Sequence, residues 1–260
     1  MKGVSLIGVD CAAKNSAKKV GLALGRCEGN AVHIKEACAG MKWEDVTEKL
    51  SGWIKTEKTA LLALDAPLGW PVSLRENIRR HKAGKPLRCA LEDADKLFYR
   101  QTDLEIIKSR KKRPLSVGAD LIARTAHAAL GLLEEVREKT GKSIGLAWVP
   151  GAPEKTQAIE VYPAVTLTAH LGKEAREKGT EKEKMQRRKK NLEKIAKMRR
   201  FRFGAKMKRE ILSDKNIFDA VLCVLAAADF VKGDVIRPTN RALAKKEGWI
   251  WVKSPQSDAR

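Results

Sequence analysis

Short apolar runs separated by turns mark the first third of the chain. Three of these runs predict strands, at residues 4–9, 19–24 and 31–36, and their Gly- or Asn-bearing connections predict an antiparallel meander. Residues 44–54 predict a helix, because the apolar positions there fall on one face. A further apolar run at residues 59–64 predicts a buried strand. The first third therefore reads as three strands, a helix and a fourth strand.

The remainder of the chain adds a strand and two long helices. A charged, Pro-broken stretch at residues 75–114 precedes a helix that ends at Gly141, with apolar residues at steps of four and three. Residues 158–161 predict a fifth strand. Residues 217–231 predict a helix that is apolar on nearly every side and therefore buried. The closing residues 248–252 predict an edge strand or a cover for the core.

The order of these elements predicts the fold class. Three strands, a helix and a fourth strand form the opening half of a ribonuclease-H-like α/β fold. With the later elements, the sequence predicts a mixed five-stranded sheet flanked by helices, folded as a single domain over residues 1–260. A chain of this length can bury a sizeable core.

Charge indicates a class of partner. The chain carries 53 Lys and Arg against 32 Asp and Glu, a formal net charge of +21, which favours polyanions: nucleic acid first, anionic membrane second. A charged fraction of 33% is also typical of heat-adapted proteins. Heat adaptation accounts for charges of both signs but not for their imbalance. We therefore expect a heat-adapted protein whose partner is nucleic acid.

The sequence predicts a cytoplasmic protein with no membrane partner. No apolar run approaches the length of a membrane span, and the N-terminus lacks a cleavage-site pattern. The five cysteines are scattered without a C-x-x-C pair, so we interpret them as reduced thiols rather than as a zinc site or a disulfide frame. The four histidines lie far apart without metal-ligand spacing, which favours structural roles.

Residues 173–209 form a basic segment inserted ahead of the last core helix. It holds 17 Lys and Arg against 5 Glu and predicts a long cationic helix or a helical hairpin. Like charges at this density repel one another unless an anion neutralises them, which favours a phosphate-binding role over a merely solvated helical face. Phe201 and Phe203 fit either base stacking or packing onto the core. The candidate nucleic-acid-binding residues are Arg187, Arg188, Lys189, Lys190, Arg199, Arg200 and Arg202.

Four carboxylates interrupt apolar runs, where an unpaired buried charge costs several kcal/mol. Asp10 and Asp65 end the first and fourth strands, Glu160 lies within the fifth, and Asp219 opens the last buried helix. Each has an ordinary explanation: a turn, an Asx-turn, an Arg partner or a helix first turn. Together they favour a site, because strand carboxyl ends meet at one edge of an α/β sheet.

Clustered carboxylates repel one another and protonate unless a cation holds them. Hard oxygen ligands select Mg²⁺ or Mn²⁺, which in phosphodiester cleavage activate a water and stabilise the leaving oxygen. The sequence thus predicts a metal-dependent nuclease with metal ligands Asp10, Asp65 and Asp219. Asp10 is the central ligand, and Glu160 is a further ligand or the base that orients the water.

At these residues the chain resembles domain-of-unknown-function family 429, described as predicted ribonuclease-H-like nucleases. The matching segments run in order through nearly the whole chain: Gly8-Val9-Asp10, Leu64 to Pro71, Arg100 to Asp103, Glu160 to Pro163, and Phe218-Asp219-Ala220. The resemblance implies the same fold and an acidic active site at Asp10, Asp65, Glu160 and Asp219. It makes Arg100 and Asp103 secondary candidates, alongside a local salt bridge as their alternative role.

One position departs from related resolvase-like nucleases, which often carry two Asp three apart on the last helix. The earlier position here is Asn216, so we expect a second metal to be held less tightly. Two other functions stay open. A non-catalytic nucleic-acid-binding protein would keep the basic segment and tolerate Asn216. An ATP-dependent phosphotransferase would use the turn at residues 8–16 for phosphate and Asp10 for Mg²⁺. The sequence selects no nucleic-acid type and no oligomeric state.

Overall fold

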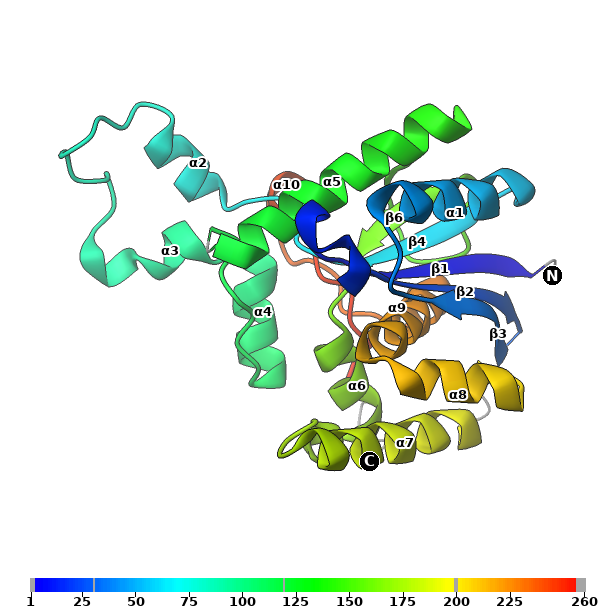
Figure 1. Ribbon diagram of the computed structural model, residues 1–260. Helices are drawn as coiled ribbons and strands as arrows, with labels where there is room; N and C mark the ends of the chain where they lie inside the picture. Colours follow the sequence, from blue (N-terminus) through cyan, green and yellow to red (C-terminus); the bar gives the residue numbers. More distant parts are fainter. Residues whose placement is uncertain (1–2, 30, 119, 199–200, 256–260) are drawn as a thin grey trace.

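A seven-stranded mixed sheet organises the computed structural model, which describes residues 3–29, 31–118, 120–198 and 201–255 (Figure 1). The strand order is β5-β6-β4-β1-β2-β3-β7. Strands β1 to β3 form an antiparallel meander, while β4 and β7 join its two sides in parallel, and β6 and β5 continue in parallel beyond β4. The strands are β1 Val4–Asp10, β2 Gly21–Glu28, β3 Ala31–Cys38, β4 Ala60–Asp65, β5 Gly145–Leu146, β6 Gln157–Glu160 and β7 Phe201–Arg202.

The predicted α/β class is confirmed, and each of the five predicted strands is present in the sheet. The predicted number of strands was wrong, because the sheet has seven. The two additional strands, β5 and β7, lie at opposite edges of the sheet and contain two residues each. Two residues are too few to show the alternating pattern by which a strand is identified in a sequence. β7 also lies inside the basic segment, where its pairing with β3 depends on tertiary contact.

Helices cover both faces of the sheet (Figure 1). α1 and α5 pack on one face, and α9 packs on the other, where α6 and α8 support it. The α-helices are α1 Trp43–Thr56, α2 Val72–Ile78, α3 Asp95–Phe98, α4 Gln101–Arg110, α5 Asp120–Thr140, α6 Pro163–Leu171, α7 Glu181–Lys197, α8 Ala205–Ser213, α9 Lys215–Lys232 and α10 Arg241–Glu247. Short 3-10 helices occupy Lys14–Lys19, Leu91–Asp93 and Lys173–Ala175.

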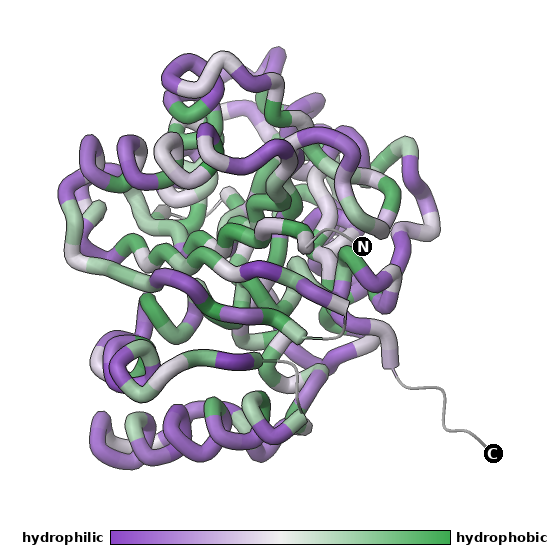
Figure 2. Tube along the Cα trace, turned by 90° about the vertical axis from the view of Figure 1, so that its right-hand side faces the viewer, coloured by the Kyte–Doolittle hydropathy of each residue, from purple (hydrophilic) through white to green (hydrophobic). Residues whose placement is uncertain are grey.

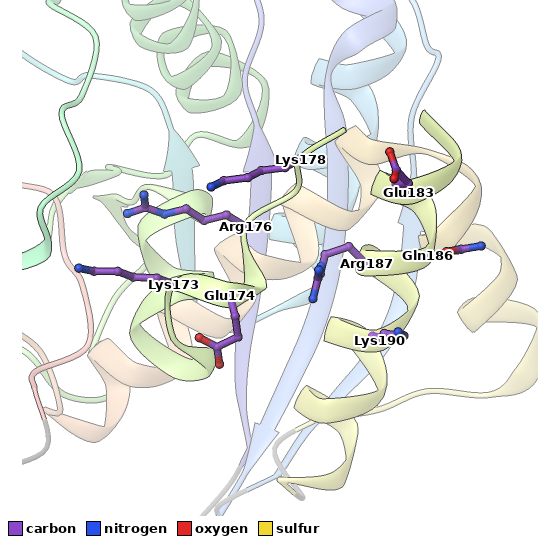
Figure 3. A pocket seen from close by; sticks show the side chains of 8 residues that line it. All are labelled: Lys173, Glu174, Arg176, Lys178, Glu183, Gln186, Arg187 and Lys190. Carbon is purple, nitrogen blue, oxygen red and sulfur yellow. The ribbon is translucent and has the colours of Figure 1, made fainter. Parts of the chain in front are cut away.

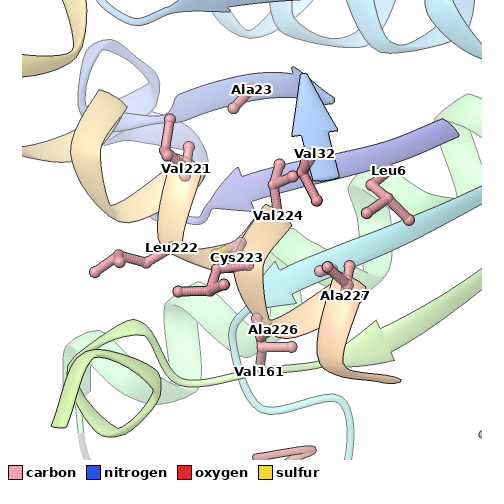
Figure 4. Close-up of a cluster of buried hydrophobic side chains, with 14 of the residues drawn as sticks. Leu6, Ala23, Val32, Val161, Val221, Leu222, Cys223, Val224, Ala226 and Ala227 are labelled. Atoms are coloured by element: carbon pink, nitrogen blue, oxygen red, sulfur yellow. The ribbon is translucent and has the colours of Figure 1, made fainter. Parts of the chain in front are cut away.

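The alternation of side chains along β4 divides the interior into two cores. Leu61 and Ala63 pack with α9, whereas Leu62 and Leu64 pack with α1 and α5. Successive side chains of a strand point to opposite faces, so a continuous apolar run indicates a strand that is covered on both sides. Figure 4 shows the α9 core, and Figure 2 shows hydrophobic segments inside with hydrophilic segments around them.

The predicted helix at residues 217–231 is confirmed as α9, which is buried along almost its whole length. Asp214 caps its N-terminus by accepting a 2.7 Å hydrogen bond from the Asn216 amide, and Gly233 ends it in the left-handed conformation. The close approach of α9 to the sheet requires small residues. A Cβ atom at Gly8 would overlap the Ala220 carbonyl oxygen, and one at Gly21 would overlap that of Asn216.

Residues 248–252 prove to be a cover for the core rather than a strand of the sheet. Trp249, Ile250, Trp251 and Val252 are all buried. Ile250 makes an isolated parallel bridge to Glu160, and the Trp251 amide donates a 2.9 Å hydrogen bond to the Glu160 carbonyl. The C-terminal segment therefore lies against the carboxyl end of β6.

The basic segment at residues 173–209 contains the predicted helix, α7, and then continues into β7 and the start of α8. It is not a free arm, because Leu192, Ile195 and Phe201 are buried in the α9 core. Phe201 thus packs onto the core. By contrast, α2 and α3 project away from the sheet (Figure 1), and α2 buries none of its side chains.

No helix in the described part of the chain combines the length and the apolar character that crossing a bilayer demands.

We expect Gly8→Ala to lower the free energy of unfolding by about 3 kcal/mol or more, because the new methyl group must push α9 off the sheet. Urea unfolding followed by circular dichroism measures the change. Gly52→Ala on α1 is the matched control, because nothing lies near a Cβ atom there, and we expect it to stabilise the protein by about 0.5–1 kcal/mol. Equal stability of the two variants would contradict the close approach.

Candidate active site

Asp10 and Asp65 lie side by side at the carboxyl ends of two neighbouring parallel strands. They are paired in register as the last residues of β1 and β4. Gly8 faces α9, and the two-residue period of a strand places Asp10 on that same face. Asp65 shares it, because Ala63 packs with α9. The strand pairing thus brings together two acids that are 55 residues apart in sequence.

Asp219 lies near this pair, because α9, which carries it, packs on the sheet face that holds Asp10 and Asp65. It lies in the second turn of α9, and Lys215 forms an ion pair with it at a spacing of four residues. Lys215 is more than half exposed at its side chain, whereas Asp219 is only 14% exposed. The structure therefore brings Asp10, Asp65 and Asp219 together with one cation among them.

Burial and mutual repulsion raise the pKa of these carboxyl groups. Burial raises the pKa of Asp10 to about 9, with repulsion from Asp65 and Asp219 adding to the shift. Burial raises the pKa of Asp65 to about 8, again with repulsion from Asp219. Burial also raises the pKa of Asp219, although Lys215 opposes the change. Within the described residues, no hydrogen-bond donor reaches the carboxylate of Asp10 or Asp65.

Glu160 is placed differently, because a buried arginine neutralises it. Arg100 Nη1 donates to Glu160 Oε2 at 2.9 Å, and Nη2 donates to Oε1 at 2.7 Å. The same guanidinium donates twice to Asp103, at 3.0 Å each, and all three side chains are at most 3% exposed. Burial raises the pKa of Glu160, while the Arg100 charge lowers it. The local ion pair considered for Arg100 and Asp103 is thus present, and it includes Glu160.

This buried cluster also fixes the loop that follows Asp65. The Leu68 amide donates to Glu160 Oε2 at 3.0 Å. Glu247 holds the next turn from the other side, accepting from the amides of Val72 at 2.7 Å and Gln101 at 2.8 Å. The distinctive segment at residues 64–71 therefore joins β4 to the C-terminal cover and to α4.

A partly apolar cavity of about 200 Å³ opens next to Asp65. Its walls come from the loops after β1 and β4, from α5 and from the start of α6, and they include Cys11, Pro67, Leu115, Ile122 and Tyr162. Burial raises the pKa of Tyr162, and the charge of Asp65 raises it further. Asp65 is thus reachable from a cavity wide enough for part of a ligand.

The donor set fits a lightly held divalent cation better than an enclosed one. Among the described residues, no group of three or more His, Cys, Asp or Glu side chains is arranged to hold a metal ion. Lys215 engages Asp219, and Arg100 engages Glu160, which leaves Asp10 and Asp65 as uncommitted neighbouring carboxylates. Mg²⁺ is commonly bound by one or two carboxylates together with waters and substrate phosphates. The pair Asp10 and Asp65 matches that pattern.

The predicted nucleic-acid-binding residues separate into three groups. Arg188 is 5% exposed and donates to Glu177 at 3.2 and 3.1 Å, so it serves the packing of α7. Arg199 and Arg200 lie outside the described residues. Those with exposed side chains are Arg187, Lys189, Lys190 and Arg202. Arg187 and Lys190 face a cavity shown in Figure 3.

Three residues near the acids were missed by sequence reasoning. Lys215 had a detectable signal, since its spacing of four from Asp219 matches a helical ion pair. Asp214 contributes repulsion at Asp10 besides capping α9. Tyr162 carried no signal, because its proximity to Asp65 arises from the pairing of β4 with β6. The backbone amide of Asn216 donates a hydrogen bond to the carboxylate of Asp214, two residues earlier.

Glu160→Gln is expected to lower the free energy of unfolding by about 3 kcal/mol, because it leaves the buried Arg100 charge with a single carboxylate partner. Urea unfolding in the presence of a chelator measures this. A variant as stable as the wild type would contradict the structural role of Glu160. A Mg²⁺-dependent rise in melting temperature that survives in Glu160→Gln would separate Glu160 from the metal ligands.

The acidic pair predicts that pH acts on the stability of the metal-free protein. An unfolded Asp ionises near its ordinary value of 3.8, whereas folded Asp65 and Asp10 retain their protons up to about 8 and about 9. Their contribution to stability is therefore complete below 3.8 and is lost as the pH rises toward 8 and 9. We expect Asp10→Asn to exceed the wild type in unfolding free energy at about pH 8 by at least about 1.4 kcal/mol.

Urea unfolding across that pH range, with a chelator present, tests this expectation. Glu138→Gln, an exposed position on α5, is the control for the loss of one surface charge. The prediction fails if the difference between Asp10→Asn and the wild type does not grow with pH.

Comparison with known proteins gives a family but no activity. A family model described as "Protein of unknown function (DUF429)" matches residues 8–243. This range includes Asp10, Asp65, Glu160 and Asp219, together with the cavity beside Asp65. No match to a curated protein was found. Since the model covers most of the chain, the protein belongs to the DUF429 family.

Proposed function

We propose that this protein is a divalent-metal-dependent nuclease that cleaves phosphodiester bonds of nucleic acid at Asp10 and Asp65. One observation carries the proposal: the carboxylates of buried Asp10 and partly buried Asp65 lie side by side at the carboxyl ends of β1 and β4, and no hydrogen-bond donor among the described residues reaches either of them. A pair of this kind is costly to fold unless it gains a cation as a ligand. Mg²⁺ or Mn²⁺ supplies that charge.

The strand order supports a ribonuclease-H-like fold for this function. An antiparallel meander β3-β2-β1 continues through parallel β4 and β6, with α9 on one face and α1 and α5 on the other. In this proposal, the two-residue strands β5 and β7 are additions at the edges. The position of both acids at strand carboxyl ends agrees with the usual placement of sites in α/β sheets.

The bound cation would activate a water and stabilise the leaving oxygen of the cleaved phosphodiester. Asp10 and Asp65 are the residues that would hold it. Asp219 and Lys215 lie above them: Asp219 accepts a hydrogen bond from water, and the ammonium group of Lys215 stabilises negative charge on the phosphate. Glu160 keeps the Asp65 loop in place through the Leu68 amide.

Positive charge around the acids supports nucleic acid as the substrate class. Exposed cations occupy α7 and β7, and residues 79–88 add a further basic stretch, Arg79-Arg80-His81-Lys82 through Arg88, on the α2–α3 side of the molecule. That stretch is exposed, with Leu87 half-buried. The chain thus offers a polyanion exposed cations from two separate parts of its sequence.

A non-catalytic nucleic-acid-binding protein is the second candidate function. Its supporting observation is that Lys215 pairs with Asp219 while Asn216 occupies the place of a further acid. In such a protein, the ammonium group of Lys215 supplies part of the positive charge that a metal ion supplies in a nuclease. The phosphotransferase hypothesis used the turn at residues 8–16 to bind phosphate. The close packing of α9 explains Gly8 without a phosphate ligand.

Cleavage of labelled DNA, RNA, RNA/DNA hybrid and four-way junction substrates tests the nuclease proposal. We expect cutting of at least one substrate with Mg²⁺ or Mn²⁺ and none with a chelator. Asp10→Asn should lower the rate by at least about a hundredfold, because it removes a metal ligand and leaves the fold intact. Glu138→Gln is the control with an unchanged rate.

The other possible outcomes of this assay lead to different conclusions. Cutting that Asp10→Asn retains would refute this active site. Tight binding without cutting under any metal would replace the nuclease by the non-catalytic binding protein. A melting temperature raised by Mn²⁺ in the wild type and unchanged in Asp10→Asn would support the metal site independently of activity.

A further inference from the structure

A second cavity, separate from the one beside Asp65, lies between the 173–178 segment and α7 (Figure 3). Its volume is about 450 Å³. Cations from both walls line it, whereas two carboxylates and one amide complete the lining. The residues are Lys173, Arg176, Lys178, Arg187 and Lys190, with Glu174, Glu183 and Gln186.

The charge of this cavity is positive and uncompensated. In the described part of the chain, none of its five cations takes part in an ion pair. Glu183 is occupied elsewhere, because its carboxylate accepts from the Thr180 amide at 2.7 Å and from the Thr180 hydroxyl at 2.9 Å as part of the α7 capping box. Five cations therefore face two carboxylates across one hollow, which favours an anionic ligand.

Arg176 gives the more specific signal. Its Nε and Nη2 atoms are buried, and no acceptor among the described residues reaches either of them. Arg176 as a whole is partly buried, but these two donor atoms are out of solvent, and leaving them without an acceptor is costly. The planar donors of a guanidinium group match the oxygens of a phosphate group. Figure 3 shows Lys173 and Lys178 extending on the same side as Arg176. Three cations of one segment thus lie together beside the cavity.

The cavity adjoins the acidic cluster. Glu177, the neighbour of Arg176, pairs with Arg188 on α7, and its charge acts on both Lys215 and Asp219. The Arg176 charge likewise acts on Tyr162, which lines the cavity beside Asp65. A phosphate held by Arg176 would therefore lie on the same side of the sheet as the proposed point of cleavage.

We propose that this cavity is a phosphate-binding subsite that holds a backbone phosphate of the nucleic acid, away from the phosphate that is cleaved. Arg176 binds the phosphate oxygens, and Lys173 and Lys178 add charge from the same segment. The inference rests on the proposed function for its ligand, nucleic acid, but not on catalysis. It makes Arg176 a positioning residue that sequence reasoning did not select.

Binding of labelled single- and double-stranded DNA and RNA oligonucleotides tests the subsite. The measurements use the full chain with Asp10→Asn and a chelator, so that no cleavage occurs. We expect Arg176→Gln to weaken binding of the preferred oligonucleotide about tenfold and to lower the slope of log Kd against log salt by about 1. The affinity of Arg176→Lys should lie between that of the protein with Arg176 and that of Arg176→Gln, because lysine keeps the charge and loses the planar donors.

Lys178→Gln and Lys182→Gln form the matched pair of controls. Both residues are exposed lysines two positions from Thr180, but only Lys178 lines the cavity. We expect Lys178→Gln to weaken binding by a few-fold and Lys182→Gln to leave it within about twofold. Melting temperatures of all variants verify that they fold.

The outcomes separate this inference from the nuclease proposal. Equal loss of affinity in Arg176→Gln and Lys182→Gln, or no oligonucleotide binding at all, would overturn the subsite. If inorganic phosphate alone raises the melting temperature of the wild type but not of Arg176→Gln, while no oligonucleotide binds, the ligand is a small phosphate and the assignment to nucleic acid is overturned. Arg176-dependent binding without metal-dependent cleavage would support the subsite and overturn only the nuclease.

Discussion

The buried guanidinium of Arg100 is the interaction on which the architecture of the active-site edge depends. It joins Asp103 of α4 to Glu160 of β6 with four hydrogen bonds of 2.7–3.0 Å, and all three side chains are buried. Through Glu160 it reaches the loop after β4, and through the Glu247 carbonyl, at 3.4 Å, it reaches the C-terminal cover. Four segments distant in sequence are thus fixed around one cation. A lysine could not replace it, because only the planar fork satisfies two carboxylates at once.

The same sheet edge contains acids of two kinds, and the difference between them locates the function. Glu160 has a full set of partners, so its burial contributes to the structure. Asp10 and Asp65 are neighbours in register with no donor in the described chain, and their pKa values are raised to about 9 and about 8. A folded protein rarely tolerates such a pair without a use for it, since it lowers stability at neutral pH. The rigid cluster around Arg100 holds in place the strand ends that carry this strain.

The basic segment divides in a similar way between structure and binding. Arg188 and Arg187 are adjacent on α7, yet Arg188 is buried against Glu177 while Arg187 faces the cavity with Arg176. The apolar residues Leu192 and Ile195 anchor the helix in the core. A rigidly anchored helix presents its free cations at fixed positions, so binding a phosphate there costs little conformational entropy. Residues 173–209 contribute 17 − 5 = +12 of the net charge of +21.

Local patterns were sufficient for the main elements, because burial on one or two faces imposes a period on the sequence. The meander, α1, β4, α9 and the grouping of Asp10, Asp65 and Asp219 at one edge all followed from that period and from the geometry of strand ends. Only the tertiary structure decided which acids are neutralised. Glu160 and Asp10 look alike in sequence, since each is an acid in an apolar run, and the distinguishing partner of Glu160 is an arginine 60 residues away. The short strands β5 and β7 and the orphaned nitrogens of Arg176 depended in the same way on packing between distant segments, which leaves no periodic signal in the chain.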